Sequence, residues 1–94
     1  MKWILVTGAT GGLGQAITRN VFEQTEYGVI SISSSSEYNN KELEKKYQER
    51  FRHIQYDLRN SKGIKELYLN QISKIGIVYG LVNNSAIAYD DIVS

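Results

Sequence analysis

Hydrophobic residues gather in four short runs along the chain, with longer and more polar stretches between them. The clearest run, residues 3–6, is unbroken and ends at Thr7 and Gly8. Short apolar runs of this kind are typical of strands that are buried on both faces of a parallel sheet. The runs therefore predict strands near residues 3–7, 28–33, 51–56 and 79–83.

The stretches between the predicted strands have the spacing of amphipathic helices. Asn40 is predicted to cap a second helix that runs through residue 49, and Asn60 or Ser61 to cap a third. Apolar residues at helical spacing predict the inner faces: Leu13, Ala16, Ile17 and Val21 in the first helix, Leu43 and Tyr47 in the second, and Ile64, Leu67, Tyr68 and Ile72 in the third.

Strands that alternate with helices predict an α/β fold with a parallel sheet, right-handed crossovers and helices on both faces. In a Rossmann-type doubly wound sheet the third strand lies at one edge, followed by the second, the first and the fourth. No linker is visible, so residues 1–94 are expected to form one domain with an incomplete sheet. Without a fifth strand beside it, the fourth is an expected exposed edge, and such edges self-associate. We therefore expect a homo-oligomer.

Composition narrows the possible partners and the compartment. The 94 residues carry a formal net charge of +1, which gives no electrostatic reason to expect nucleic acid or an anionic membrane as a partner. The absence of cysteine excludes disulfides and thiolate catalysis and fits a reducing compartment. No apolar stretch approaches the length of a membrane span. A cytoplasmic protein is expected.

A glycine-rich loop joins the first predicted strand to the first predicted helix. At such a turn, backbone N–H groups and the helix dipole converge on one point, which suits a phosphate. Gly8 is expected to permit the tight turn, Gly11 and Gly12 to let a pyrophosphate approach, and Gly14 to let the helix pack closely. The Thr10 hydroxyl is expected to reach a phosphate or a ribose. The expected binding residues of the loop are Gly8, Thr10, Gly11, Gly12, Leu13 and Gly14.

Two other kinds of glycine-rich loop compare with a dinucleotide loop. A Walker-type phosphate loop is excluded, because no Gly-Lys-Ser/Thr follows the glycines. A glycine-rich turn without a ligand stays open, although the flanking strand and helix both favour a binding loop.

The loop has the form Thr7-Gly8-x-x-x-Gly12-x-Gly14, and two further motifs follow strands. Asp57-Leu58 comes after the third predicted strand, and Leu81-Val82-Asn83-Asn84-Ser85-Ala86 ends the fourth. In this order the three motifs resemble those of the short-chain dehydrogenase/reductase family, in its classical branch. The resemblance implies that the chain is the cofactor-binding half of an NAD(P)-dependent oxidoreductase, which acts on a small-molecule alcohol or carbonyl in the full-length protein.

The sequence departs from the family pattern in two places. Ser85 and Ala86 stand where the family has Ala-Gly, and Ala86 lacks the access of glycine to positive φ. In addition, Gly8, Gly11 and Gly14 match the spacing of the extended branch, which includes nucleotide-sugar epimerases and dehydratases. The Asn83-Asn84 pair favours the classical branch.

The resemblance also assigns roles outside the glycine loop. It implies that Asp57 accepts a hydrogen bond from the adenine amino group, that the Leu58 backbone lies beside the ring, and that Asn83 lies against the adenosine ribose. Ser85 and Ala86 complete the expected site. Thr7 is expected to brace the loop near Asn83, and Asn84 to tie the fourth strand to its neighbours. For Asp57 a role as a cap or a loop charge stays open.

The end of the second strand is expected to decide between the two dinucleotides. An acid at this position binds the ribose 2′-OH and repels a 2′-phosphate. Here the position is Ser33, and Ser33, Ser34 and Ser35 offer hydroxyl donors to a 2′-phosphate. No Arg or Lys lies in this loop, and Gly11 stands where many NADP-preferring relatives place a basic residue. The balance favours NADP, with NAD as the alternative.

No catalytic residue and no metal ligand is assigned in this sequence. The chemistry of the family needs a serine and a Tyr-x-x-x-Lys motif after the fourth strand. Tyr79 and Tyr89 do not qualify, because Asn83 and Val93 stand four residues after them. The chain is therefore expected to be a fragment or a truncated product that binds cofactor and is inactive alone. A non-catalytic dinucleotide-binding module and an extended-branch enzyme are the alternatives.

Overall fold

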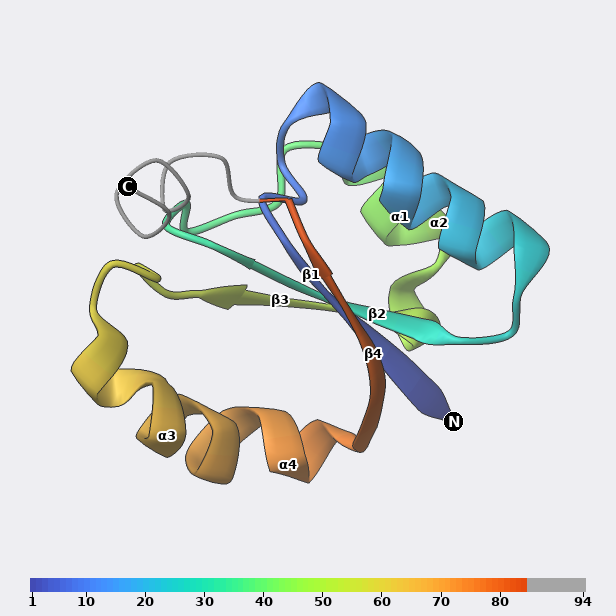
Figure 1. Ribbon diagram of the computed structural model, residues 1–94. Coiled ribbons are helices and arrows are strands. Elements are labelled where there is room, and N and C mark those ends of the chain that lie inside the picture. Colours follow the sequence, from blue (N-terminus) through green and yellow to red (C-terminus); the bar gives the residue numbers. More distant parts are fainter. Residues whose placement is uncertain (85–94) are drawn as a thin grey trace.

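The computed structural model describes residues 1–84, and within them the chain forms a four-stranded sheet with helices on both faces (Figure 1). All neighbouring strands are parallel, and their order is β3-β2-β1-β4. The strands are β1 (Lys2–Thr7), β2 (Gly28–Ser33), β3 (Phe51–Gln55) and β4 (Ile77–Asn83). The predicted α/β class and the predicted strand order are confirmed. Ser85 and Ala86 lie outside the described residues.

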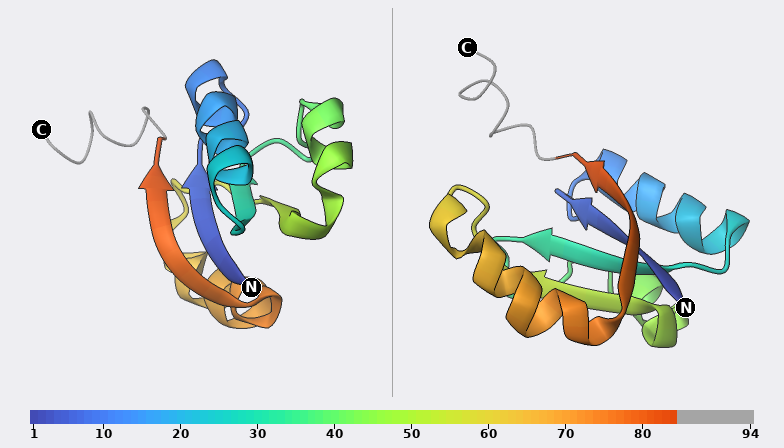
Figure 2. Two further views of the ribbon diagram at one scale, coloured as in Figure 1. Left: turned by 90° about the vertical axis from the view of Figure 1, so that its right-hand side faces the viewer. Right: turned by 60° about the horizontal axis from the view of Figure 1, so that its bottom comes forward.

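Helices cover the two faces of the sheet separately (Figure 2). One face carries α1 (Gly12–Gln24) and α2 (Lys41–Lys46), which is followed by a 3-10 turn at Gln48–Arg50. The other carries a continuous helical stretch. This stretch consists of a 3-10 turn (Ser61–Gly63), α3 (Ile64–Leu67), a π-helical segment (Tyr68–Ile72) and α4 (Ser73–Ile75). The chain thus builds the two-sided cover that a parallel sheet needs.

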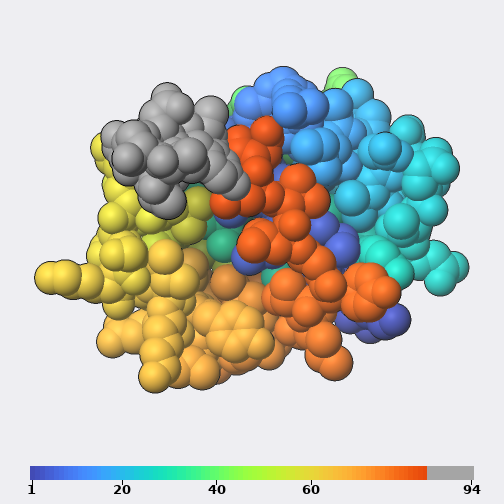
Figure 3. Space-filling model, in the orientation of Figure 1, coloured from blue at the N-terminus to red at the C-terminus, as the bar shows by residue number. Residues whose placement is uncertain are grey.

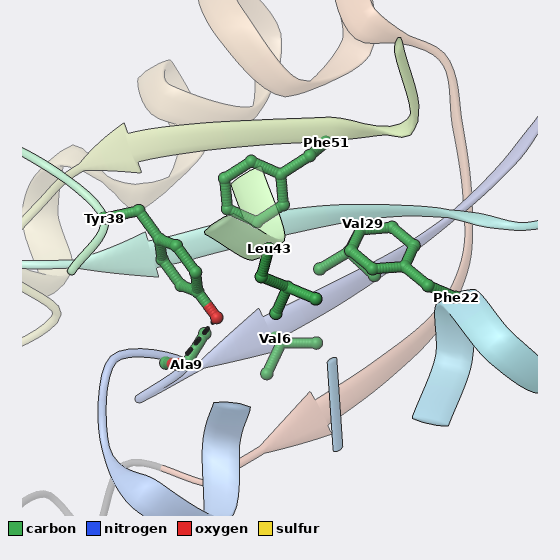
Figure 4. Close-up of a cluster of buried hydrophobic side chains, with 7 residues drawn as sticks. All are labelled: Val6, Ala9, Phe22, Val29, Tyr38, Leu43 and Phe51. Carbon is green, nitrogen blue, oxygen red and sulfur yellow. Dashed lines mark hydrogen bonds between the residues drawn. The ribbon is translucent and has the colours of Figure 1, made fainter. Parts of the chain in front are cut away.

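The core on the side of α1 and α2 is rich in aromatic rings (Figure 4). Phe22 from α1 stacks on Tyr47 with ring centroids 4.3 Å apart and meets Phe51 edge-on at 6.2 Å. The buried members of this cluster are Val6, Ala9, Phe22, Val29, Tyr38, Leu43 and Phe51. The cluster joins α1, α2 and the first three strands into one packed unit.

The core on the opposite side is centred on Trp3, which is 5% exposed. Its buried neighbours are Ile30, Ile32, Ile54, Leu67 and Ile72. Two glycines leave room for the indole, because a Cβ placed on Gly28 or Gly76 would lie 2.5 Å or 2.6 Å from its ring atoms. The indole of Trp3 is thus part of the core.

The third helix buries a different face from the one predicted. Leu67 and Ile72 are buried, but Ile64 and Tyr68 are 42% and 48% exposed. The cause is the π-helical segment, whose i→i+5 hydrogen bonds bring residues five positions apart onto one face. The prediction assumed the α-helical period and was wrong for these two residues. No side-chain cap from Asn60 or Ser61 forms, because a 3-10 turn begins the stretch instead.

Three other boundaries and faces differ from the predictions. The second helix ends at Lys46, and a 3-10 turn replaces its last predicted residues. The first helix buries Gly14, Thr18 and Phe22 instead of the predicted face, of which Leu13 (64% exposed) and Ala16 are exposed and Ile17 and Val21 are half-buried. The fourth strand begins at Ile77, earlier than predicted. The predicted Asn40 cap is confirmed, since its Oδ1 accepts the Leu43 N–H at 3.0 Å.

β4 lies at an edge of the sheet and, among residues 1–84, pairs only with β1. An extra residue in β4 shifts its register at Trp3 and Ile4. Ile77, Tyr79 and Leu81 are 76%, 59% and 61% exposed, and Figure 3 shows β4 at the surface between α1 and the α3–α4 stretch. The exposed apolar edge predicted from the sequence is therefore present in the described part of the chain. Self-association through it stays a prediction.

Candidate functional site

The glycine loop, residues 7–14, turns from the end of β1 into the start of α1. Gly8 has φ 66°, the left-handed region that favours glycine, and its carbonyl accepts the Gly11 N–H at 3.3 Å. Gly11 caps α1 without a side chain, and no acid lies in the first turn of the helix. The first N–H groups of a helix have no partner within it, and Gly11, Gly12 and Leu13 are exposed. The loop therefore presents N–H donors and a positive helix end to solvent.

The glycines of the loop face different surroundings. A Cβ on Gly12 would have nothing within 4 Å, whereas a Cβ on Gly14 would lie 2.1 Å from the Gly8 carbonyl oxygen. Gly14 thus permits close packing, as predicted, but the surface it meets is the loop backbone at Gly8 and Ala9. Gly12 leaves open space above the helix end. Close packing explains why a glycine stands at position 14, but it does not explain the glycine at position 12.

β4 braces the loop from one side. Thr7 Oγ1 donates to Asn83 Oδ1 at 2.9 Å and accepts the Asn84 N–H at 3.0 Å. Asn84 Nδ2 donates to the Gly8 carbonyl at 3.4 Å. The bracing role expected for Thr7 and the tying role expected for Asn84 are confirmed, and Asn83 is placed beside the loop.

The segment before α2 braces the loop from the other side. Asn39 Nδ2 and Gln15 Nε2 donate to the Thr10 carbonyl at 2.9 Å and 3.0 Å. The Tyr38 hydroxyl donates to the Ala9 carbonyl at 3.2 Å, and burial raises the pKa of that hydroxyl. The carbonyls of the loop are thereby occupied inside the protein. Sequence analysis missed Tyr38 and Asn39, because they lie far from the loop along the chain.

The serine loop, residues 33–36, follows β2 at the same edge of the sheet. The Ser33 carbonyl accepts the Tyr56 N–H at 2.7 Å, and Ser33 Oγ accepts the Ser35 N–H at 3.2 Å. Ser34 and Ser35 are exposed. The nearest acid in sequence, Glu37, lies 3.9 Å from Lys41 across an exposed ion pair. The loop is therefore a polar surface of hydroxyl groups without its own charge.

Asp57 lies in the loop after β3, where it pairs with Arg59. Its Oδ2 lies 2.8 Å from Arg59 Nη2, and its Oδ1 accepts the Arg59 backbone N–H at 3.0 Å. The side-chain hydrogen bond from Arg59 lowers the pKa of Asp57 from 3.8 to about 2, so the carboxylate is ionised at neutral pH. Leu58 packs against the core on the Trp3 side. The turn role that the sequence left open for Asp57 is present in the structure.

We expect Asp57→Ala to weaken dinucleotide binding by about 1 kcal/mol, the scale of one hydrogen bond, because the mutation removes the acceptor that the family resemblance assigns to the adenine amino group. Calorimetric titration measures the change. Arg59→Ala is the control, since it removes the ion pair and keeps both Asp57 oxygens. Equal losses in the two variants would mean that Asp57 only shapes the turn.

The described site residues converge on one edge of the sheet, because all four strands run in the same direction (Figure 2). A hollow of about 730 Å³ lies between α2 and β3; Ser36 at the end of the serine loop, Tyr38 and His53 are among its lining residues, and no residue of the glycine loop is. Among residues 1–84, no cluster of three His, Cys, Asp or Glu side chains could hold a metal ion. No helix in the same part of the chain has the length and apolar character needed to cross a membrane.

A parallel sheet of order 3-2-1-4, with a glycine loop between its first strand and first helix, defines a Rossmann-type domain. The sequence model of the short chain dehydrogenases matches residues 2–93. The chain belongs to this family.

Solved structures of the family have the same arrangement. Serine dehydrogenase from Escherichia coli is 33% identical with a TM-score of 0.72, over 87% of this chain and 37% of its own. A short-chain dehydrogenase/reductase from Saccharomyces cerevisiae is 30% identical with a TM-score of 0.72, over 90% of this chain and 34% of its own. The chain thus spans little more than a third of the length of these relatives.

A dTDP-glucose 4,6-dehydratase from Bacillus anthracis has a similar fold. It is 20% identical with a TM-score of 0.66, over 97% of this chain and 29% of its own. At this identity the likeness concerns the fold alone. No curated protein is detectably similar to the chain.

Proposed function

We propose that this chain is the dinucleotide-binding part of an NAD(P)-dependent oxidoreductase that interconverts an alcohol and a carbonyl. The observation that carries the proposal is the open surface over Gly12 at the start of α1, where a Cβ would have no neighbour within 4 Å among residues 1–84. Membership of the short-chain dehydrogenase family supports the redox chemistry. The cytoplasmic location and the homo-oligomer expected from the sequence are part of this proposal.

The residues present fit a dinucleotide. The start of α1 offers backbone N–H groups to the pyrophosphate, and neither a side-chain cap nor an acid competes for them. Gly8, Thr10, Gly11, Gly12, Leu13 and Gly14 would form this part of the site. Asp57, Leu58 and Asn83 would hold the adenosine, and Ser85 and Ala86 are assigned to the site from the family motif. The bound nicotinamide would supply or accept the hydride.

The serine loop supports NADP over NAD. At this position an acid would repel a 2′-phosphate, but Ser33 stands there, and the closest acid, Glu37, is paired with Lys41. Ser34 and Ser35 are exposed and can donate hydroxyl hydrogen bonds to a phosphate. NAD is the alternative cofactor, because no cation lies in the loop.

We expect residues 1–94 to bind cofactor without turnover. They contain no Tyr-x-x-x-Lys motif. Tyr79 lies in the first half of β4, with its ring 5.3 Å from that of Tyr27 and 4.5 Å from Lys2 Nζ. Lys2 begins β1 and Tyr27 directly precedes β2, so both lie at the opposite end of these strands from the glycine loop. Carbonyl reduction by these residues alone would contradict the proposal.

The cofactor site is tested by Gly12→Ala. We expect at least a tenfold loss of NADPH affinity, about 1.4 kcal/mol, because the methyl group enters the space over the helix end. The melting temperature without cofactor should stay the same or rise, because the methyl group meets no other atom and alanine favours a helix.

Thermal-shift titrations with NADPH and NADH, side by side, make this measurement. At about 100 times its dissociation constant a cofactor stabilises the native state by about 2.7 kcal/mol. In a domain of this size each kcal/mol moves the melting temperature by about 4–8 °C. Asn20→Ala, exposed on the same helix, is the control: it should leave the cofactor affinity unchanged and, like Gly12→Ala, keep or raise the melting temperature. No shift of the unmodified chain with either dinucleotide would overturn the proposed function.

A further inference from the structure

His53, on edge strand β3, joins a buried serine to the serine loop. Its Nδ1 lies 3.0 Å from Ser31 Oγ, and its Nε2 lies 2.9 Å from the Ser35 carbonyl oxygen. A carbonyl only accepts hydrogen bonds, so Nε2 carries a proton and donates it to Ser35. In the neutral ring, Nδ1 then accepts the hydroxyl hydrogen of Ser31, which is fully buried.

The other carbonyls of the serine loop are also held from the β3 side. Gln55 Nε2 donates to the Ser34 carbonyl at 3.1 Å, and the Tyr56 N–H donates to the Ser33 carbonyl at 2.7 Å. Three consecutive loop carbonyls are therefore bonded to one strand and the residue that follows it. The His53 bond is the outermost of the three, and it fixes the exposed end of the loop.

His53 also lies next to the residue that supports the glycine loop. Its ring centroid is 6.1 Å from that of Tyr38, whose hydroxyl donates to the Ala9 carbonyl. The imidazole thus contacts the serine loop directly and lies near the residue that supports the glycine loop. A change at His53 acts first on the serine loop, because Tyr38 has its own bond to the glycine loop.

We propose that His53 is a positioning residue for cofactor choice, which holds the serine loop in the shape that accepts a 2′-phosphate. This inference rests on the proposed function. The physical reason is that the loop contains no Lys or Arg. A cation attracts a phosphate over a wide range of positions, whereas a hydroxyl donor needs a short distance and a nearly linear angle. Preference for a 2′-phosphate by serines alone therefore requires a loop fixed in place.

Two amide variants separate the two bonds of the imidazole. In His53→Gln the side-chain amide reaches the position of Nε2 and can still donate to the Ser35 carbonyl. In His53→Asn the shorter amide reaches only the position of Nδ1, so it keeps the bond to Ser31 and loses the bond to the loop. Both variants replace the imidazole by the same amide group. Any effect of losing the imidazole itself is therefore the same in the two variants.

The experiment compares dissociation constants for NADPH and NADH in each variant by calorimetry. We expect His53→Asn to lower the preference for NADPH over NADH about fivefold, the effect of one lost hydrogen bond, with NADH affinity within about twofold of the unmodified chain. His53→Gln should keep the preference within about twofold. Arg52→Gln, on the neighbouring residue whose guanidinium lies 5.4 Å from the Trp3 ring, is the control and should leave it unchanged.

The outcomes distinguish the two proposals. An unchanged preference in His53→Asn, or an equal loss for both cofactors, would overturn the role of His53 and leave the proposed function intact. An unmodified chain that binds neither dinucleotide would overturn the proposed function itself. An unmodified chain that prefers NADH would overturn the choice of NADP and the role of His53 with it.

Discussion

Replacement of Gly14 by alanine is expected to destabilise the domain by about 3 kcal/mol, the upper part of the range for an overpacked site. The new Cβ would lie 2.1 Å from the Gly8 carbonyl oxygen and 2.6 Å from the Ala9 Cα. Both contacts are with backbone, so no flexible side chain can move aside. The helix or the loop has to shift.

Neither the loop nor the helix is free to make that shift. Gly8 is held in a left-handed conformation, and its carbonyl accepts bonds from Gly11 and Asn84. The Ala9 carbonyl accepts the bond from Tyr38. On the helix side, the Thr18 hydroxyl donates to the Gly14 carbonyl at 2.8 Å and is fully buried. The clash therefore breaks bonds on whichever side moves, and NADPH binding is expected to be lost together with stability.

Urea unfolding followed by circular dichroism measures the change in the free energy of unfolding. Gly12→Ala is the matched control, because the same methyl group two residues earlier in the helix meets nothing within 4 Å among residues 1–84. Equal midpoints for the two variants would show that α1 does not approach the loop as closely as described.

Replacement of Arg50 by methionine is expected to cost about 2–3 kcal/mol, the scale of hydrogen bonds to a charged group in a half-buried site. The guanidinium binds backbone carbonyls in the last turn of α1 and in the residues that follow it. Nη1 donates to the Phe22 carbonyl at 3.3 Å, and Nη2 donates to those of Thr25 and Tyr27 at 2.6 Å and 2.9 Å. The last carbonyls of a helix have no partner within it. A cation at this end also interacts favourably with the negative end of the helix dipole.

Arg50 contributes to the aromatic core as well. Its guanidinium carbon lies 5.3 Å from the Phe22 ring and 5.7 Å from the Tyr47 ring. Methionine keeps an unbranched apolar stem and removes the charge and the donors, so the variant isolates the polar contribution. Arg50→Lys keeps the charge without the planar fork, and its stability should lie between the two.

Chemical unfolding again provides the measurement, with Arg59→Met as the control. Arg59 forms only an exposed ion pair with Asp57, and its loss should change stability by less than about 0.5 kcal/mol. Cofactor affinity of Arg50→Met should match that of the unmodified chain, because Arg50 binds the end of α1 opposite to the glycine loop. A stability loss no larger than that of Arg59→Met would show that water replaces the guanidinium at these carbonyls.

Features that depend on neighbours in sequence were predictable. The apolar runs indicated the strands, and the Asn40 cap needs only the N–H of a residue three positions later. The glycine loop could be located because its glycines stand between a predicted strand and a predicted helix. The order of the strands follows from the doubly wound arrangement of a Rossmann-type sheet, in which the crossovers are right-handed.

Helix faces were less predictable, because they depend on the local helical period. The sequence around Leu67 and Ile72 fits an α-helical pattern that includes Tyr68, and the spacing of its apolar residues does not indicate a π-helical segment. A single change of period rotated the buried face and left Tyr68 exposed. Packing against Trp3 and the sheet selected the pair that is actually buried.

The sequence by itself determined the fold class, the family and the edge of the sheet at which a dinucleotide would bind, because periodicity and motif spacing are local signals. Only the tertiary structure decided how that edge is held. The bonds of Arg50 to the end of α1, of Asn39 to Thr10 and of His53 to the serine loop join residues far apart in sequence. Such bonds form where folding places a carbonyl that lacks a partner beside a suitable donor. A periodic pattern along the chain cannot predict which distant residues come together in this way.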